Sequence, residues 1–316
     1  MKEVKNFEEF KVAVIDGIRD WLPEQFATAH VSLQTVTKNN DLKLTGLTIQ
    51  SVGSNIAPTI YLEGFYEKYQ EGVEMPEILR RIADVRMEHE VEGDFDASQI
   101  TDFTRCQDKI LPRIIGAEWN QELLEKRPHV LIEDLAVTFC IDLGTHADGS
   151  MSVPIHNELM NGWGVTSDDL YEIAVKNLTD SNVGTFRSMN EVMLEMMLPN
   201  IIAECDGDEE AARETLDMMM PPEDRMYVLC NKDKIYGASV LLDQKLMQSV
   251  IDRIGNEFYI LPSSVHECLV VPASQDMEPS DLVSMVREVN STTVSNEDRL
   301  SNNIYTYSIE EGIKLA

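Results

Sequence analysis

The chain has 316 residues, of which 43% are hydrophobic and 26% charged, so it can bury a sizeable core as one large domain or two ordinary ones. It carries 56 acidic against 26 basic residues, a net charge of −30, and such a surface repels nucleic-acid phosphates and anionic lipids. The composition therefore argues against direct binding to nucleic acid or to a membrane surface. Basic proteins, cations and uncharged ligands stay open as partners.

The sequence also indicates a compartment. No stretch reaches the length of about 18 consecutive apolar residues that a membrane-spanning helix needs. The first 23 residues do not have the layout of a signal peptide, because Lys11 and Asp16 interrupt their apolar run. The five cysteines, at positions 106, 140, 205, 230 and 268, are odd in number and form no C-x-x-C pair. We therefore expect a cytoplasmic protein with free cysteines.

The N-terminal third reads as a helix, a hairpin and two more helices. Apolar residues recur at helical spacing over 6–22, from Phe7 to Trp21. Strands are predicted over 30–37 and 42–50, because the Asn and Asp residues at 39–41 suit a hairpin turn. A short strand and a helix follow over 59–72, and a further helix over 75–91. Residues 93–96 are the candidate linker, which divides the chain into regions 1–95 and 96–316 unless the two form one continuous domain.

The middle third predicts one hairpin and three helices. Two strands lie within 136–155 around a turn at Asp148, and a helix with Ser167 as its N-cap ends near residue 178. Ser188 and Glu191 have capping-box spacing before a helix that Pro199 is expected to kink or end. An acidic helix over 206–224 is expected to stop at the prolines 221 and 222.

The last third repeats the plan. A hairpin is predicted over 226–242, a helix over 242–255 and one or two strands over 257–272, before a helix at 279–290 and a strand at 303–309. A hairpin followed by a helix thus occurs near residues 31, 136 and 226. These runs of hairpins predict an α+β fold in which antiparallel hairpins carry helices on one face.

The stretch "SSVHEC" at 263–268 holds residue types used in catalysis. On a straight strand Ser264 and His266 would lie about 6.5–7 Å apart, whereas a nucleophile and its base must lie within about 3.2 Å. The stretch matches neither G-x-S-x-G nor H-E-x-x-H, and Pro262 indicates a sheet edge or a break between strands. A half-buried strand with satisfied polar groups is favoured over a pocket wall built on His266.

Other motifs are similarly weak. The acidic residues around His146 do not have EF-hand spacing, and Gly162-Trp163-Gly164 lacks a phosphate-binding pattern, so no metal or cofactor is predicted. The methionines of 189–197 and 218–220 favour core packing over an adaptable binding groove. From Glu204 to Asp224 there are nine acidic residues and one basic residue. This segment is expected to be a solvated face, with imitation of DNA charge as the alternative.

Several segments together resemble a known family. They are "VPIHNELMNGWGVTSDDLYEIAVKN", "IYGASVLL", and "YILPSSVHECLVVPASQDMEPSDLVSMVREVN" followed by "LSNNIYTYS". They resemble a bacterial family of gut Firmicutes known as domain of unknown function number 5688, with the strongest likeness from about residue 126 onward. The resemblance implies a bacterial cytoplasmic protein, often encoded near mobile genetic elements, but no activity, cofactor or catalytic residue. The association with mobile elements favours a role against host defence.

Three functions stay open. The leading hypothesis is an acidic cytoplasmic protein without catalytic activity that binds a protein partner, with an unknown oligomeric state. The second is a DNA mimic that captures a basic or nucleic-acid-binding protein through Glu209, Glu210, Glu214 and Asp217. The third is an enzyme of unrecognised class with a pocket near His266, whose candidate residues are His156, Asn157, Trp163, Ser263, Ser264, His266 and Glu267.

Overall fold

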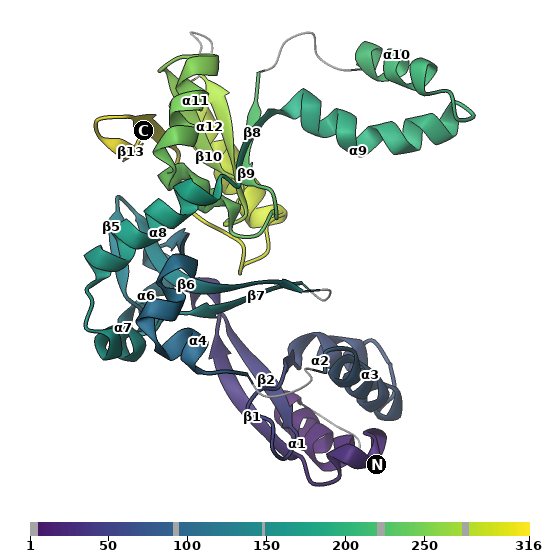
Figure 1. Cartoon of the computed structure of the whole chain (residues 1–316). Helices are drawn as coiled ribbons and strands as arrows, with labels where there is room; N and C mark the ends of the chain where they lie inside the picture. Colours follow the sequence, from purple (N-terminus) through teal and green to yellow (C-terminus); the bar gives the residue numbers. More distant parts are fainter. Residues whose placement is uncertain (1–5, 91–94, 147–148, 220–224, 274–277) are drawn as a thin grey trace. The chain divides into compact units, whose positions relative to one another are not determined.

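The computed structural model describes residues 6–90, 95–146, 149–219, 225–273 and 278–316. The chain forms two compact units, Met1–Gln99 with Thr145–Ser150, and Ile100–Gly144 with Met151–Ala316. Each unit combines helices with antiparallel sheet (Figure 1), so the predicted α+β class is confirmed. Residues 93–94 of the predicted linker at 93–96 lie outside the described residues, and residues 95–96 have no regular secondary structure.

The first unit has a three-stranded sheet in the order β1 (His30–Thr37), β2 (Lys43–Gln50), β3 (Thr59–Tyr61). Its helices are α1 (Phe7–Gly17), α2 (Glu63–Gln70) and α3 (Met75–Glu88), with short 3-10 turns at Ile18–Trp21, Glu24–Phe26 and Asn39–Asp41. The apolar stripe of α1 packs as predicted at Phe10 and Val14, and Ile18 extends it into the next turn. Trp21, the last residue of that predicted stripe, is exposed because the chain there has left the α-helical spacing.

The second unit contains two sheets. The larger has six strands in the order β13 (Gly312–Leu315), β12 (Tyr305–Ser308), β10 (Phe258–Pro262), β11 (Glu267–Pro272), β9 (Tyr227–Asn231), β8 (Gly184–Ser188). The smaller has the order β4 (Ile110–Gly116), β6 (Leu135–His146), β5 (His129–Ile132), and β7 (Gly149–Pro154) also pairs with β6. Neighbouring strands with a described register are antiparallel.

Helices of several lengths connect these strands. The longer ones are α8 (Ser167–Ser181), α9 (Met189–Glu204), α10 (Glu209–Met219), α11 (Gln244–Ile254) and α12 (Pro279–Thr292). The short ones are α4 (Ser98–Thr101), α5 (Phe103–Cys106), α6 (Gln121–Lys126) and α7 (Asn157–Trp163), with 3-10 turns at Gln107–Lys109, Glu118–Asn120 and Gly237–Leu242 (η6).

The large sheet of the second unit buries side chains on both faces. Ile260 and Val270 join the main core with residues of α8 and α11. Leu261 and Val271 point the other way and pack with Leu282 and other residues of α12 in a separate cluster. The prediction that helices cover one face therefore needs a correction: alternating side chains on β10 and β11 are apolar in both directions, so both faces require a cover.

Three local predictions also differ from the structure. Thr166, not Ser167, caps α8, in a capping box that it forms with Asp169. Pro199 does not end α9, which continues to Glu204. The apolar run at Gly237–Leu242 forms a 3-10 helix instead of the second strand of a hairpin, and β9 pairs with β8 and β11. The Ser188–Glu191 capping box is confirmed.

Candidate functional site

The stretch "SSVHEC" does not form a continuous strand. β10 ends at Pro262 and β11 begins at Glu267, so residues 263–266 form the loop of a hairpin. The break expected at Pro262 is confirmed, and the strand predicted across Ser264 and His266 is wrong. Strand alternation therefore does not decide which way these side chains point.

His266 is held by hydrogen bonds at both ring nitrogens. Its Nδ1 lies 3.2 Å from the backbone nitrogen of Tyr236, which can only donate, so Nδ1 accepts. Its Nε2 then carries the proton and donates to Oδ1 of Asp298 at 3.0 Å. The other carboxylate oxygen of Asp298 accepts from Oγ of Ser295 at 2.7 Å. This arrangement suits a histidine that positions a loop, because neither nitrogen is left to take a proton from a substrate.

The other polar side chains of the loop make local contacts. Oγ of Ser264 accepts from the backbone N–H of His266 at 3.0 Å, and Oγ of Ser263 donates to Oε1 of Glu267 at 3.3 Å. Neither hydroxyl donates to the imidazole. The loop therefore does not assemble the serine–histidine pair of nucleophilic catalysis.

Tyr236 is the residue that His266 positions. Its φ of 50° lies in the left-handed region, which is unfavourable for a bulky side chain. The next residue must be glycine, because a Cβ at Gly237 would lie 2.3 Å from the carbonyl oxygen of His266. The Tyr236 ring lies 3.9 Å from the guanidinium carbon of Arg113, measured to the ring centroid. The hairpin loop thus fixes an aromatic ring over an arginine.

Two predicted site residues serve the packing of short helices. Nδ2 of Asn157 donates to the carbonyl oxygen of Glu125 at 2.9 Å. Nε1 of Trp163 donates to the carbonyl oxygen of Thr101 at 2.9 Å, and its ring packs against Phe103 at 5.4 Å between centroids. Both side chains therefore tie α7 to neighbouring segments.

His156 lies near Arg127 in the second unit. Burial lowers the pKa of His156, and the nearby charge of Arg127 lowers it further. Among the described residues, no hydrogen bond or ion pair joins His156 or Asn157 to the loop of His266. The enzyme pocket that was considered for these residues therefore has no support from a direct contact between them.

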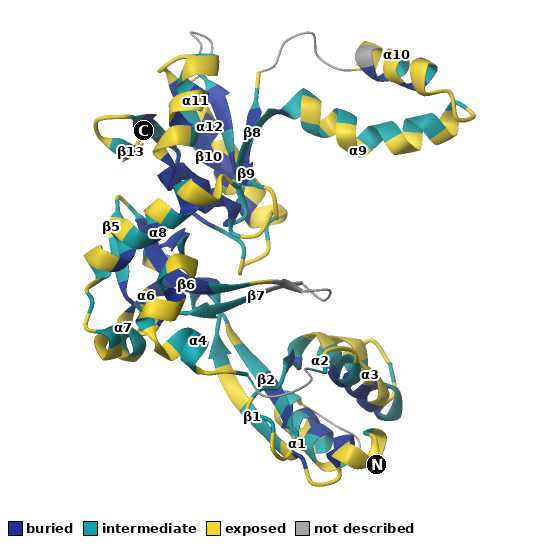
Figure 2. Cartoon of the chain, in the orientation of Figure 1, coloured by how far each residue is buried: buried dark blue, intermediate teal, exposed yellow. Residues whose placement is uncertain are grey.

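The methionine-rich segment forms a pair of helices, α9 and α10, that pack on each other, and we call it the α9–α10 hairpin (Figure 1). α9 has no buried residue, as its teal and yellow ribbon shows in Figure 2. The methionines Met193, Met196, Met218 and Met219 are exposed by 39, 70, 81 and 61%. The prediction that these methionines pack in a core is wrong. Ala212 and Leu216 are the described buried residues of α10, and neither belongs to a core cluster of the two units.

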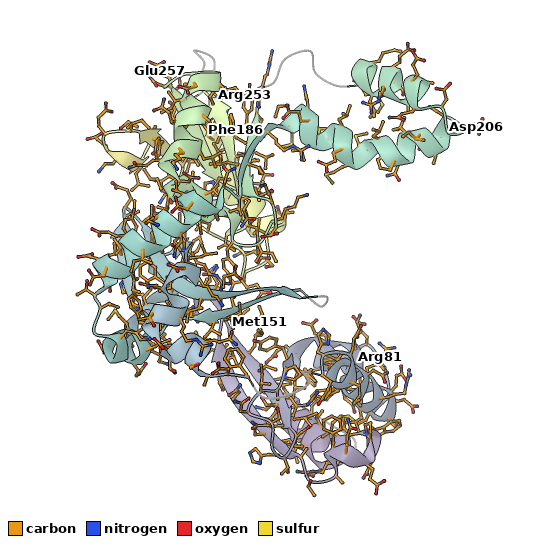
Figure 3. The ribbon with its side chains drawn as sticks, in the orientation of Figure 1. Arg81, Met151, Phe186, Asp206, Arg253 and Glu257 are labelled. Atoms are coloured by element: carbon orange, nitrogen blue, oxygen red, sulfur yellow. The ribbon has the colours of Figure 1, made fainter. Side chains whose placement is uncertain are left out.

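The acidic candidates lie on α10. Glu209 pairs with Arg213 at 2.8 Å, whereas Glu210 and Glu214 are exposed. The side chain of Asp217 lies outside the described residues. Asp206 lies in the turn between α9 and α10, where Figure 3 labels it, and Asp208 accepts two backbone N–H groups of the first turn of α10. The acidic side chains and the exposed methionines therefore occupy the same hairpin.

The base of the hairpin is held by an arginine that the sequence does not reveal. Arg253 of α11 lies 5.6 Å from the ring centroid of Phe186 and 5.2 Å from that of Tyr227. Its guanidinium also pairs with Glu191 in the first turn of α9 at 3.4 Å. Phe186 and Arg253 lie next to each other in Figure 3. The spacing of these residues in the sequence gives no signal of this contact, because four separate elements supply them.

The described residues were also compared with the requirements of a metal site and of a membrane-spanning helix, and they meet neither. No group of three or more metal-ligating side chains occurs in the described parts of the chain. No helix there is both long and apolar enough to cross a membrane.

The comparisons with known proteins identify a family. No curated protein and no solved structure matches the chain. The model of a family of unknown function, DUF5688, matches residues 7–309. The chain therefore belongs to the DUF5688 family.

Proposed function

We propose that this protein binds a protein partner through the α9–α10 hairpin, and that the partner presents apolar residues among basic ones. The observation behind the proposal is the contrast between composition and burial in α9. Nine of its sixteen residues are Met, Val, Leu or Ile, distributed around the helix, yet none is buried. A helix that is apolar on all sides is normally enclosed by protein.

The chemistry of the exposed residues suits an interface. Burial of a side chain the size of methionine contributes about 1.5–3 kcal/mol. Methionine is unbranched and polarizable, so a methionine-rich surface adapts to the shape of a partner. Contact with another protein would therefore recover stabilisation that Met196 and Met218 do not gain within this chain.

Charge indicates the partner's chemistry. Residues 189–219 hold nine acidic residues and one basic residue, Arg213. A second copy of the chain would bring the same negative charge to the contact, and like charges placed together are unfavourable. A partner with lysine and arginine around an apolar patch would complement both features. The proposal places this interaction in the cytoplasm, where the five free cysteines would stay reduced.

Affinity capture with matched variants tests the proposal. The bait proteins are the wild type, the double variant Met196→Glu/Met218→Glu, and the control Val52→Glu, which changes a residue exposed by 78% in the first unit. We expect mass spectrometry to find a basic partner that wild type and control retain and the double variant loses. High salt should weaken this partner's retention only in part, because salt screens charges but not apolar contacts.

Other outcomes would change the conclusion. The proposal is overturned if the double variant captures the same proteins as the wild type. A nucleic-acid-binding protein that is released completely by salt, and lost on Glu210→Gln/Glu214→Gln but not on the methionine changes, would instead support the DNA mimic. Light scattering of the purified protein checks self-association. If the protein forms a dimer that the methionine changes break, the partner is a second copy of the chain, and the proposal of a different protein is contradicted.

A further inference from the structure

Two arginines lie close together on the small sheet of the second unit. Arg113 of β4 is paired in register with Thr138 of β6, which in turn is opposite His129 of β5, so these three side chains share one face. Arg127 precedes β5 by two residues. The ring of Tyr236 lies over Arg113. We call Arg113, Arg127, His129 and Tyr236 the arginine cluster.

Neither arginine has a carboxylate partner among the described residues. The guanidinium of Arg113 donates to Oγ of Ser152 and lies against the Tyr236 ring. Among the titratable groups that affect the pKa of Arg127 are Tyr236, Arg113 and Cys140, none of which is a carboxylate. Other arginines of the chain, such as Arg80, Arg187 and Arg253, pair with glutamates. The nearest acidic residue on the same face of β6, Asp142, accepts the backbone N–H of Gly144.

This arrangement is unfavourable unless an anion completes it. The chain has more than two acidic residues for each basic one. A shortage of acidic residues therefore does not explain why these arginines have no acidic partner. Burial lowers the pKa of Arg127, and the neighbouring Arg113 opposes its charge as well. Placing two like charges together in a partly dry site favours the uptake of a negative ligand.

The donors suit a tetrahedral oxyanion. Guanidinium groups bind phosphate through paired, charge-assisted hydrogen bonds. Nδ1 of His129 donates to the carbonyl oxygen of Arg127 at 2.9 Å, because that oxygen can only accept. Nε2 of His129 is therefore the ring nitrogen left to face a ligand. Arg113, Arg127 and Tyr236 are all half-buried, so solvent reaches them in part.

From this geometry we propose that the arginine cluster binds a phosphate group, either as inorganic phosphate or as the phosphate of a small monoester. Two guanidinium charges match a dianion. His266 supports the site indirectly, because it holds the backbone of Tyr236, whose ring in turn lies over Arg113. The site is built from β4, β5 and the loop before η6, and it does not depend on the proposed role of the α9–α10 hairpin.

Calorimetric titration of the full chain with inorganic phosphate tests the inference. Acetate and chloride at matched ionic strength serve as control anions. We expect saturable binding of one phosphate per chain, and a loss of roughly tenfold or more in affinity for Arg127→Gln, because charge-assisted hydrogen bonds are lost. Arg80→Gln removes an exposed arginine of α3 and should leave phosphate binding unchanged. A glycerol phosphate titration then separates a monoester site from one that accepts only inorganic phosphate.

The inference is overturned if acetate or chloride binds as well as phosphate, or if Arg127→Gln binds phosphate like the wild type. Circular dichroism checks that the variant is folded. If Arg127→Gln does not fold, Arg127→Lys replaces it, since lysine keeps the charge but loses the paired donors. Weaker phosphate binding by Arg127→Lys supports the site, and unchanged binding rejects it.

Discussion

The backbone N–H of Tyr236 donates to Nδ1 of His266 at 3.2 Å, and this bond joins the β10–β11 loop to a residue with a φ of 50°. A bulky residue persists in this conformation only where its surroundings hold it. His266 thus has a structural role that also determines where the Tyr236 ring lies. Its sequence neighbours Ser264 and Glu267 contribute to the same loop through local hydrogen bonds.

Replacement of His266 should therefore destabilise the second unit. We expect His266→Ala to lower the free energy of unfolding by about 1–3 kcal/mol, because the N–H of Tyr236 loses its acceptor. His266→Asn keeps an acceptor close to the position of Nδ1 and should cost less. Urea denaturation followed by circular dichroism measures both variants. Equal free energies of unfolding for His266→Ala and wild type would show that the hydrogen bond to Tyr236 does not stabilise the fold.

The regular elements of the chain were largely predictable, whereas contacts between distant segments were not. The helix at Gln244–Ile254 has a clear apolar spacing and a glycine after its last turn, and the hairpin of β1 and β2 has Asn and Asp residues in its turn. The run Gly237–Leu242 does not form the predicted strand, because a short apolar segment fits a buried strand and a buried helical turn equally well.

The candidate site was harder to predict for a physical reason. Arg113 and Tyr236 are 123 positions apart in the sequence, and only the fold brings the ring to the guanidinium. The methionines of α9 have the composition of a core, but composition does not say whether the chain supplies anything to cover them. A polar residue inside the apolar strand "ILPRIIG" was the one available signal for Arg113.

A second prediction concerns Asp134, which accepts hydrogen bonds from three side chains. Tyr305 OH donates to Oδ1 at 2.7 Å, and Ser301 and Asn303 donate to Oδ2 at 2.8 and 3.0 Å. Burial raises the pKa of Tyr305, so its hydroxyl stays protonated and remains a donor. Asp134→Ala leaves this buried hydroxyl without its acceptor, and we expect a loss of about 1–3 kcal/mol in the free energy of unfolding.

Tyr305→Phe provides the matched control for Asp134. It removes the donor as well as the hydrogen bond, so it should cost less than Asp134→Ala in chemical denaturation. The double variant should be more stable than the sum of the two single effects implies, because both changes remove the same bond. Strict additivity of the two changes would contradict a shared hydrogen bond between Asp134 and Tyr305.

A third prediction concerns thiol reactivity. Burial raises the pKa of Cys106, Cys140, Cys230 and Cys268, which keeps these thiols protonated and unreactive near neutral pH. Cys205, after the last turn of α9, is only half-buried. We expect iodoacetamide to modify Cys205 first in the native protein and all five cysteines after denaturation. Cys205→Ser should abolish the fast phase, and rapid modification of a second cysteine would contradict the burial of the other four.

The last prediction concerns the stability of the α9–α10 hairpin against that of the sheet beside it. Ala212 and Leu216 are buried in the hairpin but join no core cluster, whereas β10 supplies Ile260 and Leu261 to two clusters. Local opening is easiest where few apolar contacts are buried. We therefore expect hydrogen exchange, followed by mass spectrometry, to be much faster in peptides of 189–219 than in peptides of 258–272.

The exchange experiment also shows whether the ion pair of Arg253 or a bound partner slows hydrogen exchange in the α9–α10 hairpin. Arg253→Ala removes the ion pair to Glu191 at the base of the hairpin and should speed exchange in the first turns of α9, while Arg80→Ala in α3 should not. A captured partner should slow exchange across residues 189–219, because it would bury the methionines there. Slow exchange of the hairpin in the purified protein would mean that α9 is already covered, which contradicts its exposure within a single chain.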